Sequence, residues 1–365
     1  MRAHAFILLA AGQMACRAQM PVEHGVARDV GKLAAVDFHG WPAMALRNGH
    51  TEVVVVPAIG RVMSLGFAGD VAGSDPLWRH DQLGPTLAPD ENGWTNYGGD
   101  KAWPAPQANW ERMVGKGWPP PATFDAVAHT ATARDSTIEL LSPVDPAYGL
   151  RVRRRVSLQD DLMLIDTTYE KTAGPSVRVA VWTITQLVSP ERMFALLPAR
   201  PAFAGGHRSL LPATPKDLTV DGRLLGLGRH PTEKTMIAND ADKLLWVGAG
   251  RSLVIEATGT EEDVRSALRP DGVRAQIYTS PDGAEPYVEL ELLGPLVDLA
   301  PGQSTTMSVR YRLFRREQVD ATAEARRVFA AELGRTPQGP TSHRPGKISA
   351  SQRYGFGLRG RSRRR

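Results

Sequence analysis

Cysteine is almost absent from this chain, because Cys16 is the only one among 365 residues. It lies in an N-terminal segment that we expect to be removed, so the mature protein is predicted to have no cysteine. Disulfides, thiol catalysis and zinc–thiolate sites are excluded together.

Recognisable metal, nucleotide and hydrolase motifs are lacking as well. No pair of histidines has the spacing of a zinc-binding helix, and no Asp/Asn run matches a calcium loop. No GxSxG, Walker or dinucleotide fingerprint stands at a strand-to-helix junction. We therefore predict no metal site and no cofactor, with a calcium ion held by backbone and carboxylate oxygens as the alternative.

Long apolar runs are lacking after the first residues, since no stretch approaches the ~18 apolar residues that span a membrane. The N-terminus itself has Met1-Arg2 followed by AFILLAAGQMA, which is typical of a secretory signal peptide. We predict a signal peptide over residues 1–18 and hence a periplasmic or secreted bacterial protein. A lipoprotein anchored at Cys16 and a first helix or strand of the fold are the alternatives.

Acidic residues are missing from the last part of the chain. Residues 341–365 carry eight Lys/Arg and no Asp/Glu, so the +5 net charge becomes −3 (5 minus 8) without them. This composition predicts a disordered basic tail over residues 335–365. The folded part is mildly acidic, so we expect it not to bind nucleic acid, although the tail has the charge to contact nucleic acid, acidic polymers or lipid headgroups.

Short alternating apolar runs recur along the chain with turn signals between them. They predict strands over 32–38, 42–47, 51–56, 61–67, 136–141, 150–158, 162–169, 177–185, 192–197, 244–248, 252–257, 274–279, 287–293 and 305–314. One C-terminal helix is expected within 317–334, with Asp320 as its N-cap. Because helices do not alternate with strands, we predict an all-β protein of two large antiparallel sheets stacked face to face.

Five of the eight tryptophans lie between Trp78 and Trp118, in a Gly/Pro-rich stretch that interrupts the strands from about residue 69 to 124. We interpret it as a long functional loop. Its rings suit the flat, partly apolar faces of a sugar, and Trp103 stands among the polar residues Asp100, Lys101 and Gln107. The alternative is that the rings plug one end of a β-structure.

The run PYVELELLGP, residues 286–295, predicts a strand with two unlike faces. Tyr287, Glu289 and Glu291 share one face, and the two carboxylates are ~7 Å apart by strand rise. A rigidly held carboxylate suits a general base. The alternative is a solvated outer face with two ordinary glutamates.

Other candidates are single residues. Trp182 and Gln186 share a face of the predicted strand 177–185 and its extension, and Arg61 and Lys234 are cations suited to ligand hydroxyls or carboxylates. His207 lies in the loop Gly205-Gly206-His207-Arg208. Surface charges and a plain turn are the alternatives.

Several segments together resemble one family. IGRVMSLGF, NYGGDKAWPAPQ, GWPPPATFD, VAVWTITQL and PYVELELLGPLVDLAPGQS occur in an order similar to the galactose mutarotase-like superfamily, relatives of aldose 1-epimerase. The resemblance implies a β-supersandwich domain over residues 30–316 with a carbohydrate ligand in a cleft.

The resemblance also implies roles for particular residues. In aldose 1-epimerases a glutamate on a late strand takes the anomeric hydroxyl proton and a histidine protonates the ring oxygen. By position Glu289 or Glu291 matches the base, with Glu289 preferred, and Arg61 lies near the place of an early arginine. Neither His207 nor His230 has the family's His-x-Tyr-Phe-Asn setting. A non-catalytic carbohydrate-binding module, a protein related to polysaccharide lyases or glycoside hydrolases, and a structural envelope protein are the alternatives.

Overall fold

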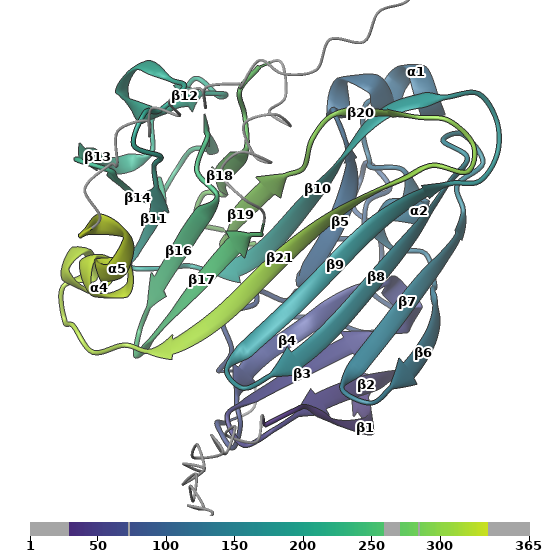
Figure 1. Ribbon diagram of the computed structural model, residues 1–365, viewed down its shortest axis with the longest axis horizontal. Coiled ribbons are helices and arrows are strands. Elements are labelled where there is room, and N and C mark those ends of the chain that lie inside the picture. Colours follow the sequence, from purple (N-terminus) through teal and green to yellow (C-terminus); the bar gives the residue numbers. More distant parts are fainter. Residues whose placement is uncertain (1–28, 72–73, 259–270, 284, 335–365) are drawn as a thin grey trace, which may run out of the picture.

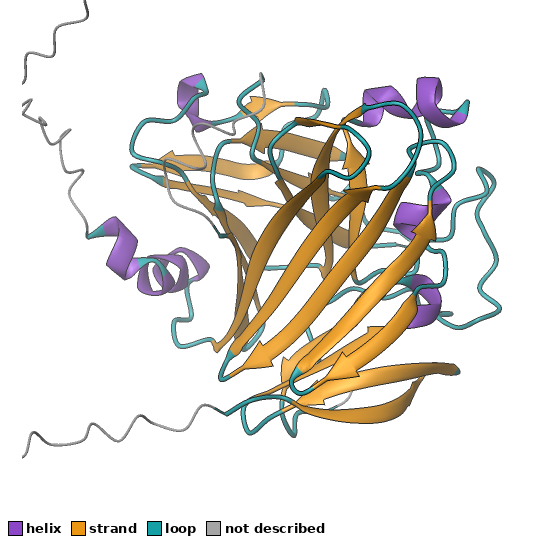
Figure 2. Ribbon diagram, turned by 45° about the vertical axis from the view of Figure 1, so that its right-hand side comes forward, coloured by secondary structure: helices purple, strands orange, loops and turns teal. Residues whose placement is uncertain are grey.

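The computed structural model describes residues 29–71, 74–258, 271–283 and 285–334. They form two large antiparallel sheets that lie one over the other, as Figures 1 and 2 show. The predicted all-β fold of two stacked sheets is therefore confirmed. The predicted signal peptide over residues 1–18 and basic tail over 335–365 lie outside the described residues.

The first sheet has eleven strands, and its order follows the chain only in part. In spatial order it contains β1 (Lys32–Phe38), β2 (Trp41–Arg47), β3 (Thr51–Val56), β4 (Arg61–Phe67), β5 (Asp100–Ala105), β10 (Val177–Val188), β19 (Tyr287–Leu293), β18 (Ala275–Thr279), β15 (Thr235–Asn239) and β12 (Arg208–Ser209), with β20 (Val297–Leu299) paired separately to β10. Neighbouring strands of this sheet pair antiparallel.

The second sheet has ten strands, and its neighbouring strands also pair antiparallel. In spatial order it contains β13 (Lys216–Asp221), β14 (Leu224–Gly228), β11 (Arg192–Leu196), β16 (Lys243–Gly248), β17 (Arg251–Ala257), β21 (Ser304–Arg315), β9 (Leu162–Lys171), β8 (Leu150–Gln159), β7 (Thr137–Val144) and β6 (Thr130–Arg134). In Figure 1 its strands β21, β9, β8 and β7 form the front layer.

Helices are few and short among the described residues. They are α1 (Trp110–Val114), α2 (Ala122–Asp125), α4 (Ala321–Val328) and α5 (Ala330–Leu333), with 3-10 turns at Pro57–Ile59, Gln107–Asn109 and Ala204–Gly206. The predicted N-cap is confirmed, because the Asp320 carboxylate accepts a hydrogen bond from the Ala323 N–H at 2.7 Å. Helix α4 places Ala325 against Phe194 and Leu245, so it covers an outer face of the second sheet.

A polar network lies between the two sheets and joins them. The Asp100 carboxylate of β5 forms an ion pair with Arg154 of β8 and accepts hydrogen bonds from Thr185 at 2.8 Å and Tyr311 at 2.6 Å. All four side chains are buried. This placement differs from the expectation that Asp100 contacts a ligand, since both oxygens of its carboxylate are bonded inside the sandwich and the side chain is 0% exposed.

The Trp-rich stretch is not one long loop, which corrects a second expectation. Its middle forms β5, a wholly buried strand between β4 and β10. Alternation along β5 sends Asp100 to the interior and Lys101 and Trp103 to the outer face of the first sheet. The sequence hides this strand because Pro104 lies inside it and two glycines precede it.

Candidate functional site

Cross-strand register brings the candidate glutamates together with partners from two neighbouring strands. Gln186 of β10 lies opposite Glu289 of β19, which in turn lies opposite Tyr278 of β18. One row away, Glu291 lies opposite Gln276. Directly paired residues point to the same face, so these side chains share the outer face of the first sheet with Lys101. We call Lys101, Gln186, Gln276, Tyr278, Glu289 and Glu291 the Glu289 site.

Solvent exposure increases across the Glu289 site from one side to the other. Gln186 is 0% exposed and Lys101 1%, while the side chain of Glu289 is 11% exposed. Gln276 and Tyr278 on β18 are partly exposed. The Glu289 carboxylate therefore stands at the boundary between a buried wall on β5 and β10 and an open side at β18.

Glu289 and Lys101 form a buried pair of opposite charge. The Lys101 Nζ atom lies 3.5 Å from Glu289 Oε1 and 4.9 Å from the centre of the Trp103 ring. Burial is the main cause that lowers the pKa of Lys101 to about 8. Burial likewise raises the pKa of Glu289, and the ammonium group of Lys101 opposes that rise. Both shifts move these groups toward neutral pH, where a general acid or base works best.

Glu291 is held in its protonated form more firmly than Glu289. Burial raises its pKa well above the usual range, and the neighbouring Glu289 charge adds to the rise. The Trp182 Nε1–H donates a hydrogen bond of 2.7 Å to Glu291 Oε2. Since two buried carboxylates side by side do not both ionise readily, the negative charge of the pair resides on Glu289.

The amide of Gln186 is buried without a hydrogen bond of normal geometry. Neither its Oε1 nor its Nε2 has such a partner among the described residues. The Gln186 amide nevertheless favours a lower pKa of Glu289. A buried amide that lacks hydrogen bonds costs free energy, so this position favours a polar group arriving from outside.

Tyr278 of the Glu289 site lies beside a second tyrosine, Tyr287. The rings of Tyr278 and Tyr287 are 6.0 Å apart, and Trp78 packs 4.9 Å from Tyr287. Burial and the Glu289 charge raise the pKa of both hydroxyls above the usual tyrosine value. Both therefore stay protonated at neutral pH and are hydrogen-bond donors.

The tryptophans pack mainly against each other, which corrects the expected open platform. Trp103 and Trp182 meet edge to face at 5.5 Å and are 4% and 7% exposed. Trp110 and Trp118 also lie within 6.4 Å of this pair, and only Trp118, at 37%, offers much surface. The faces of Trp103 and Trp182 are thus occupied by other rings, and the cluster lies beside Lys101 on the same face of the sheet.

Asp125 at the end of α2 fixes this aromatic cluster. Its carboxylate accepts hydrogen bonds from the indole N–H of Trp103 at 2.8 Å and of Trp94 at 3.0 Å. The same carboxylate pairs with the Arg61 guanidinium at 2.8 Å. Arg61 is 0% exposed, so it holds the segment over the sheet and has no open surface for a ligand.

Replacing Asp125 with asparagine is expected to destabilise the fold by about 3–5 kcal/mol, because the buried Arg61 charge loses its counter-ion. Equilibrium urea unfolding measures the change. Asp298→Asn is the control, since that carboxylate is exposed and only 3.9 Å from Arg178. Equal stability of the two variants would contradict this role of Asp125.

Three predicted residues lie apart from the Glu289 site. Gln107 is exposed and donates to the Gly117 carbonyl at 3.4 Å. Lys234 is exposed in the turn before β15. His207 precedes β12, three strands from β19, and its Nδ1 lies 3.1 Å from the Gly205 carbonyl. At ~4.8 Å per strand this separation is about 14 Å, which is too far for His207 to share a proton transfer with Glu289.

The structure adds three residues that the sequence did not single out. Gln276 and Tyr278 lie on the predicted strand 274–279. Their places opposite Glu291 and Glu289 follow only from the pairing of this strand with Tyr287–Leu293. Asp125 ends the segment GWPPPATFD that resembles the family, but its contacts with Arg61 and Trp103 were not predicted, because those residues lie 64 and 22 positions away in the chain.

Two classes of site receive no support from the described residues. Among residues 29–334, apart from the three undescribed gaps, no group of three His, Cys, Asp or Glu is placed to hold a metal ion. In the same part of the chain, no helix has the length and apolarity to cross a membrane.

Comparisons with known proteins show similarity at the level of structure. No protein-family model and no curated protein sequence matches the chain. Among solved structures, a galactose mutarotase-like protein from Lactobacillus casei is similar with a TM-score of 0.52 and 12% identity, over 74% of this chain and 100% of that one. A candidate mutarotase from Salmonella typhimurium gives 0.51 and 10%, over 78% and 94%.

A third similar structure belongs to a larger protein. It is a TPR-domain containing protein from Parabacteroides distasonis, with a TM-score of 0.51 and 14% identity, and the match covers 81% of this chain and 55% of that one. By its two stacked antiparallel sheets and these neighbours, the chain has the galactose mutarotase-like fold.

Proposed function

We propose that the protein binds a neutral sugar on the open side of the Glu289 site and interconverts its anomers. The observation that carries the proposal is a buried, ionisable Glu289 with its charge balanced by Lys101, next to the Gln186 amide that lacks hydrogen bonds. Gln276 and Tyr278 add an amide and a hydroxyl on the exposed side. Convergent amides, hydroxyls and one charge are what a polyol needs for orientation.

The chemistry requires one base and one donor. Glu289 takes the proton of the anomeric hydroxyl, the bond between the anomeric carbon and the ring oxygen breaks, and the ring oxygen takes a proton. Tyr278, directly opposite Glu289, is the donor that the register offers. The resulting aldehyde group rotates, and the same proton transfers in reverse close the ring as the other anomer. Glu289 and Tyr278 thereby regain their starting protonation states.

The charge of the site favours neutral sugars over sugar acids. Lys101 offsets Glu289, and Arg61 offsets Asp125. Glu291 is neutral in the proposed state because of its raised pKa. No cation in this group is left to receive a ligand carboxylate.

A binding titration with neutral aldoses tests this placement. Gln276→Ala is expected to weaken binding about 3- to 10-fold, the value of one or two lost hydrogen bonds. Gln107→Ala is the matched control, because that glutamine is exposed away from the site. Equal affinities of both variants and the wild type would place the ligand elsewhere.

A non-catalytic carbohydrate-binding module is the second candidate. The observation in its favour is that the candidate acid His207 precedes a strand three positions from β19, and that the raised pKa of Tyr278 makes it a weaker acid than an ordinary tyrosine. Binding without anomer exchange would select this candidate. A glycosidase is less favoured, since Glu291 is 1% exposed and both carboxylates of such enzymes must flank the scissile bond.

Export is part of the proposal. It rests on the signal-peptide pattern of residues 1–18. Detection of the mature protein in a periplasmic or culture fraction, starting after Ala18, tests it.

A further inference from the structure

A cavity lies on the other sheet, far from the Glu289 site in the strand order. It has a volume of about 190 Å³ and lies on the outer face of the ten-stranded sheet, beside the C-terminal helical segment. Its walls come from β9, β16, β17 and β21 and from Val328 and Phe329. No step of the proposed sugar chemistry uses it.

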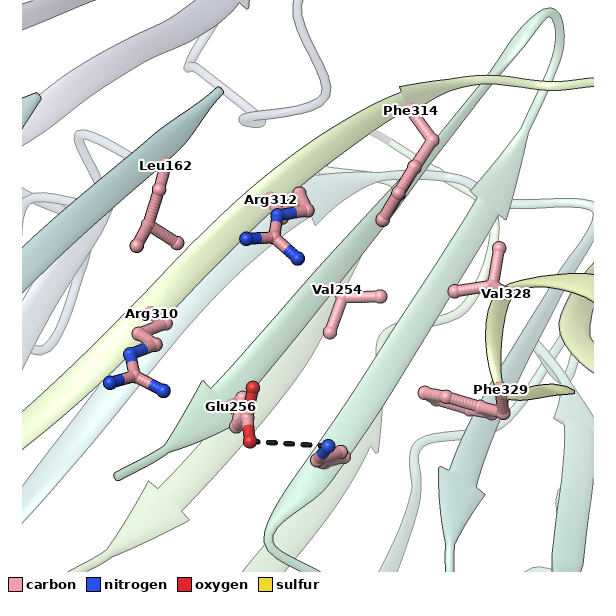
Figure 3. Close-up of a pocket in the computed structure, with 9 residues that line it drawn as sticks. Leu162, Val254, Glu256, Arg310, Arg312, Phe314, Val328 and Phe329 are labelled. Carbon is pink, nitrogen blue, oxygen red and sulfur yellow. Dashed lines mark ion pairs between the residues drawn. The ribbon is translucent and has the colours of Figure 1, made fainter. Parts of the chain in front are cut away.

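One part of the cavity is apolar. Val254 and Phe329 are 9% and 1% exposed, and Phe314 and Val328 are partly exposed. These four belong to the cluster that α4 forms with the sheet. Figure 3 shows Val254 between the arginines on one side and Val328 and Phe329 on the other.

The other part of the cavity is positively charged. Lys243, Arg310 and Arg312 line it against a single acid, Glu256, which leaves +2 (3 minus 1). Lys243 pairs with Glu256 at 3.2 Å, and Arg312 pairs with Asp161 at 3.2 Å.

Arg310 is the cation of this group without a partner among the described residues. It lies directly across from Glu256, yet that carboxylate forms its ion pair with Lys243. An exposed guanidinium offers several N–H donors in one plane and binds a carboxylate through two of them. Its place beside an apolar pocket suits a ligand that has both characters.

We propose that this cavity binds a small amphipathic carboxylate, whose charged group pairs with Arg310 and whose aromatic or branched body lies between Phe314, Val254 and Val328. The cavity is below the ~300–1,000 Å³ of sites for drug-sized ligands, so the ligand is small.

Fluorine NMR titration of the full chain with para-fluorophenylacetate tests the proposal. We expect a dissociation constant of the order of 1 mM, and weaker binding of the neutral para-fluorophenylacetamide and of acetate, because each lacks one half of the ligand. Arg310→Gln is expected to weaken binding of the carboxylate about tenfold or more.

Arg155→Gln is the matched control, since that arginine of β8 is 56% exposed on the same sheet and lies 3.8 Å from Glu139. It is expected to bind as the wild type does, and thermal melting checks that both variants fold. The proposal is overturned if the wild type does not bind at concentrations of the order of 20 mM, or if Arg310→Gln binds as tightly as Arg155→Gln. Equal binding of acid and amide would also overturn it.

Discussion

Replacing Glu289 with glutamine is expected to lower the rate of anomer exchange about 10²- to 10⁴-fold, toward the rate in buffer, because the variant keeps the shape of the side chain and loses its basicity. The variant leaves the buried Lys101 without its counter-ion, but burial lowers the pKa of Lys101 to about 8, so Lys101 can lose its proton and the fold should persist. Exchange spectroscopy by NMR on a neutral aldose measures the rate.

Glu291→Gln is the matched control on the same strand face. Glu291 is neutral in the proposed state and accepts from Trp182, and an amide oxygen accepts the same hydrogen bond. This variant is therefore expected to stay within about tenfold of the wild type, far above Glu289→Gln. If Glu291→Gln were the inactive variant and Glu289→Gln the active one, the base would be Glu291.

Replacing Lys101 with methionine is expected to move the acidic limb of the pH–rate profile to higher pH. Glu289 must be ionised to act as base, and the Lys101 charge is the largest influence that lowers its raised pKa. Without that charge the carboxyl keeps its proton up to higher pH, so activity near pH 6 should fall about tenfold or more and recover as the pH rises. Rates measured across the pH range test this expectation.

Lys101→Arg is the conservative variant and should keep the limb near its wild-type position, because it keeps the charge. A uniform loss of activity at every pH in Lys101→Met, with the limb unmoved, would show that Lys101 only supports the structure. Urea unfolding of each variant identifies a loss of fold, which would lower activity at every pH.

Much of the fold follows from the alternation of apolar residues in the sequence. Strands such as Leu150–Gln159 and Ser304–Arg315 have one mostly apolar face, and the structure confirms that their Val and Leu side chains on that face are buried. Asp320 marked the start of α4 correctly. These features are local, so a single sequence contains them.

The missed strands lack such a pattern. The strand β5 contains Pro104, β14 reads LLGLG, and β13 is mostly exposed. Their pairing partners decide their conformation, and pairing over long sequence separations is not visible in a local window. The failure to predict β5 had the largest effect on the predicted site. Asp100 and Lys101 were expected together in a loop, whereas they face opposite sides of a sheet.

The predicted placement of the candidate side chains was correct where it relied on strand faces. Tyr287, Glu289 and Glu291 share the outer face, and Gln186 lies directly opposite Glu289. It was incorrect where it relied on residue type alone: Asp100 and Arg61 are bound inside the fold, and Gln107, Lys234 and His207 lie elsewhere. Which polar residue is used internally depends on partners such as Asp125 and Arg154, which are distant in sequence.

The interpretation of the tryptophans changed most between sequence and structure. A cluster of rings in a Gly/Pro-rich stretch suggested an open platform. The rings instead pack against each other, and Trp103 contacts Lys101, which pairs with Glu289. Their contribution is a rigid apolar wall that lowers the pKa of Lys101 by burial.

The most direct test of the account is the rate of anomer exchange for a panel of neutral aldoses with the purified wild-type protein, compared with buffer and with Glu289→Gln. We predict exchange above the buffer rate for at least one aldose, and loss of that excess in the variant. Exchange at the buffer rate for every aldose, together with no binding by any of them, would contradict it.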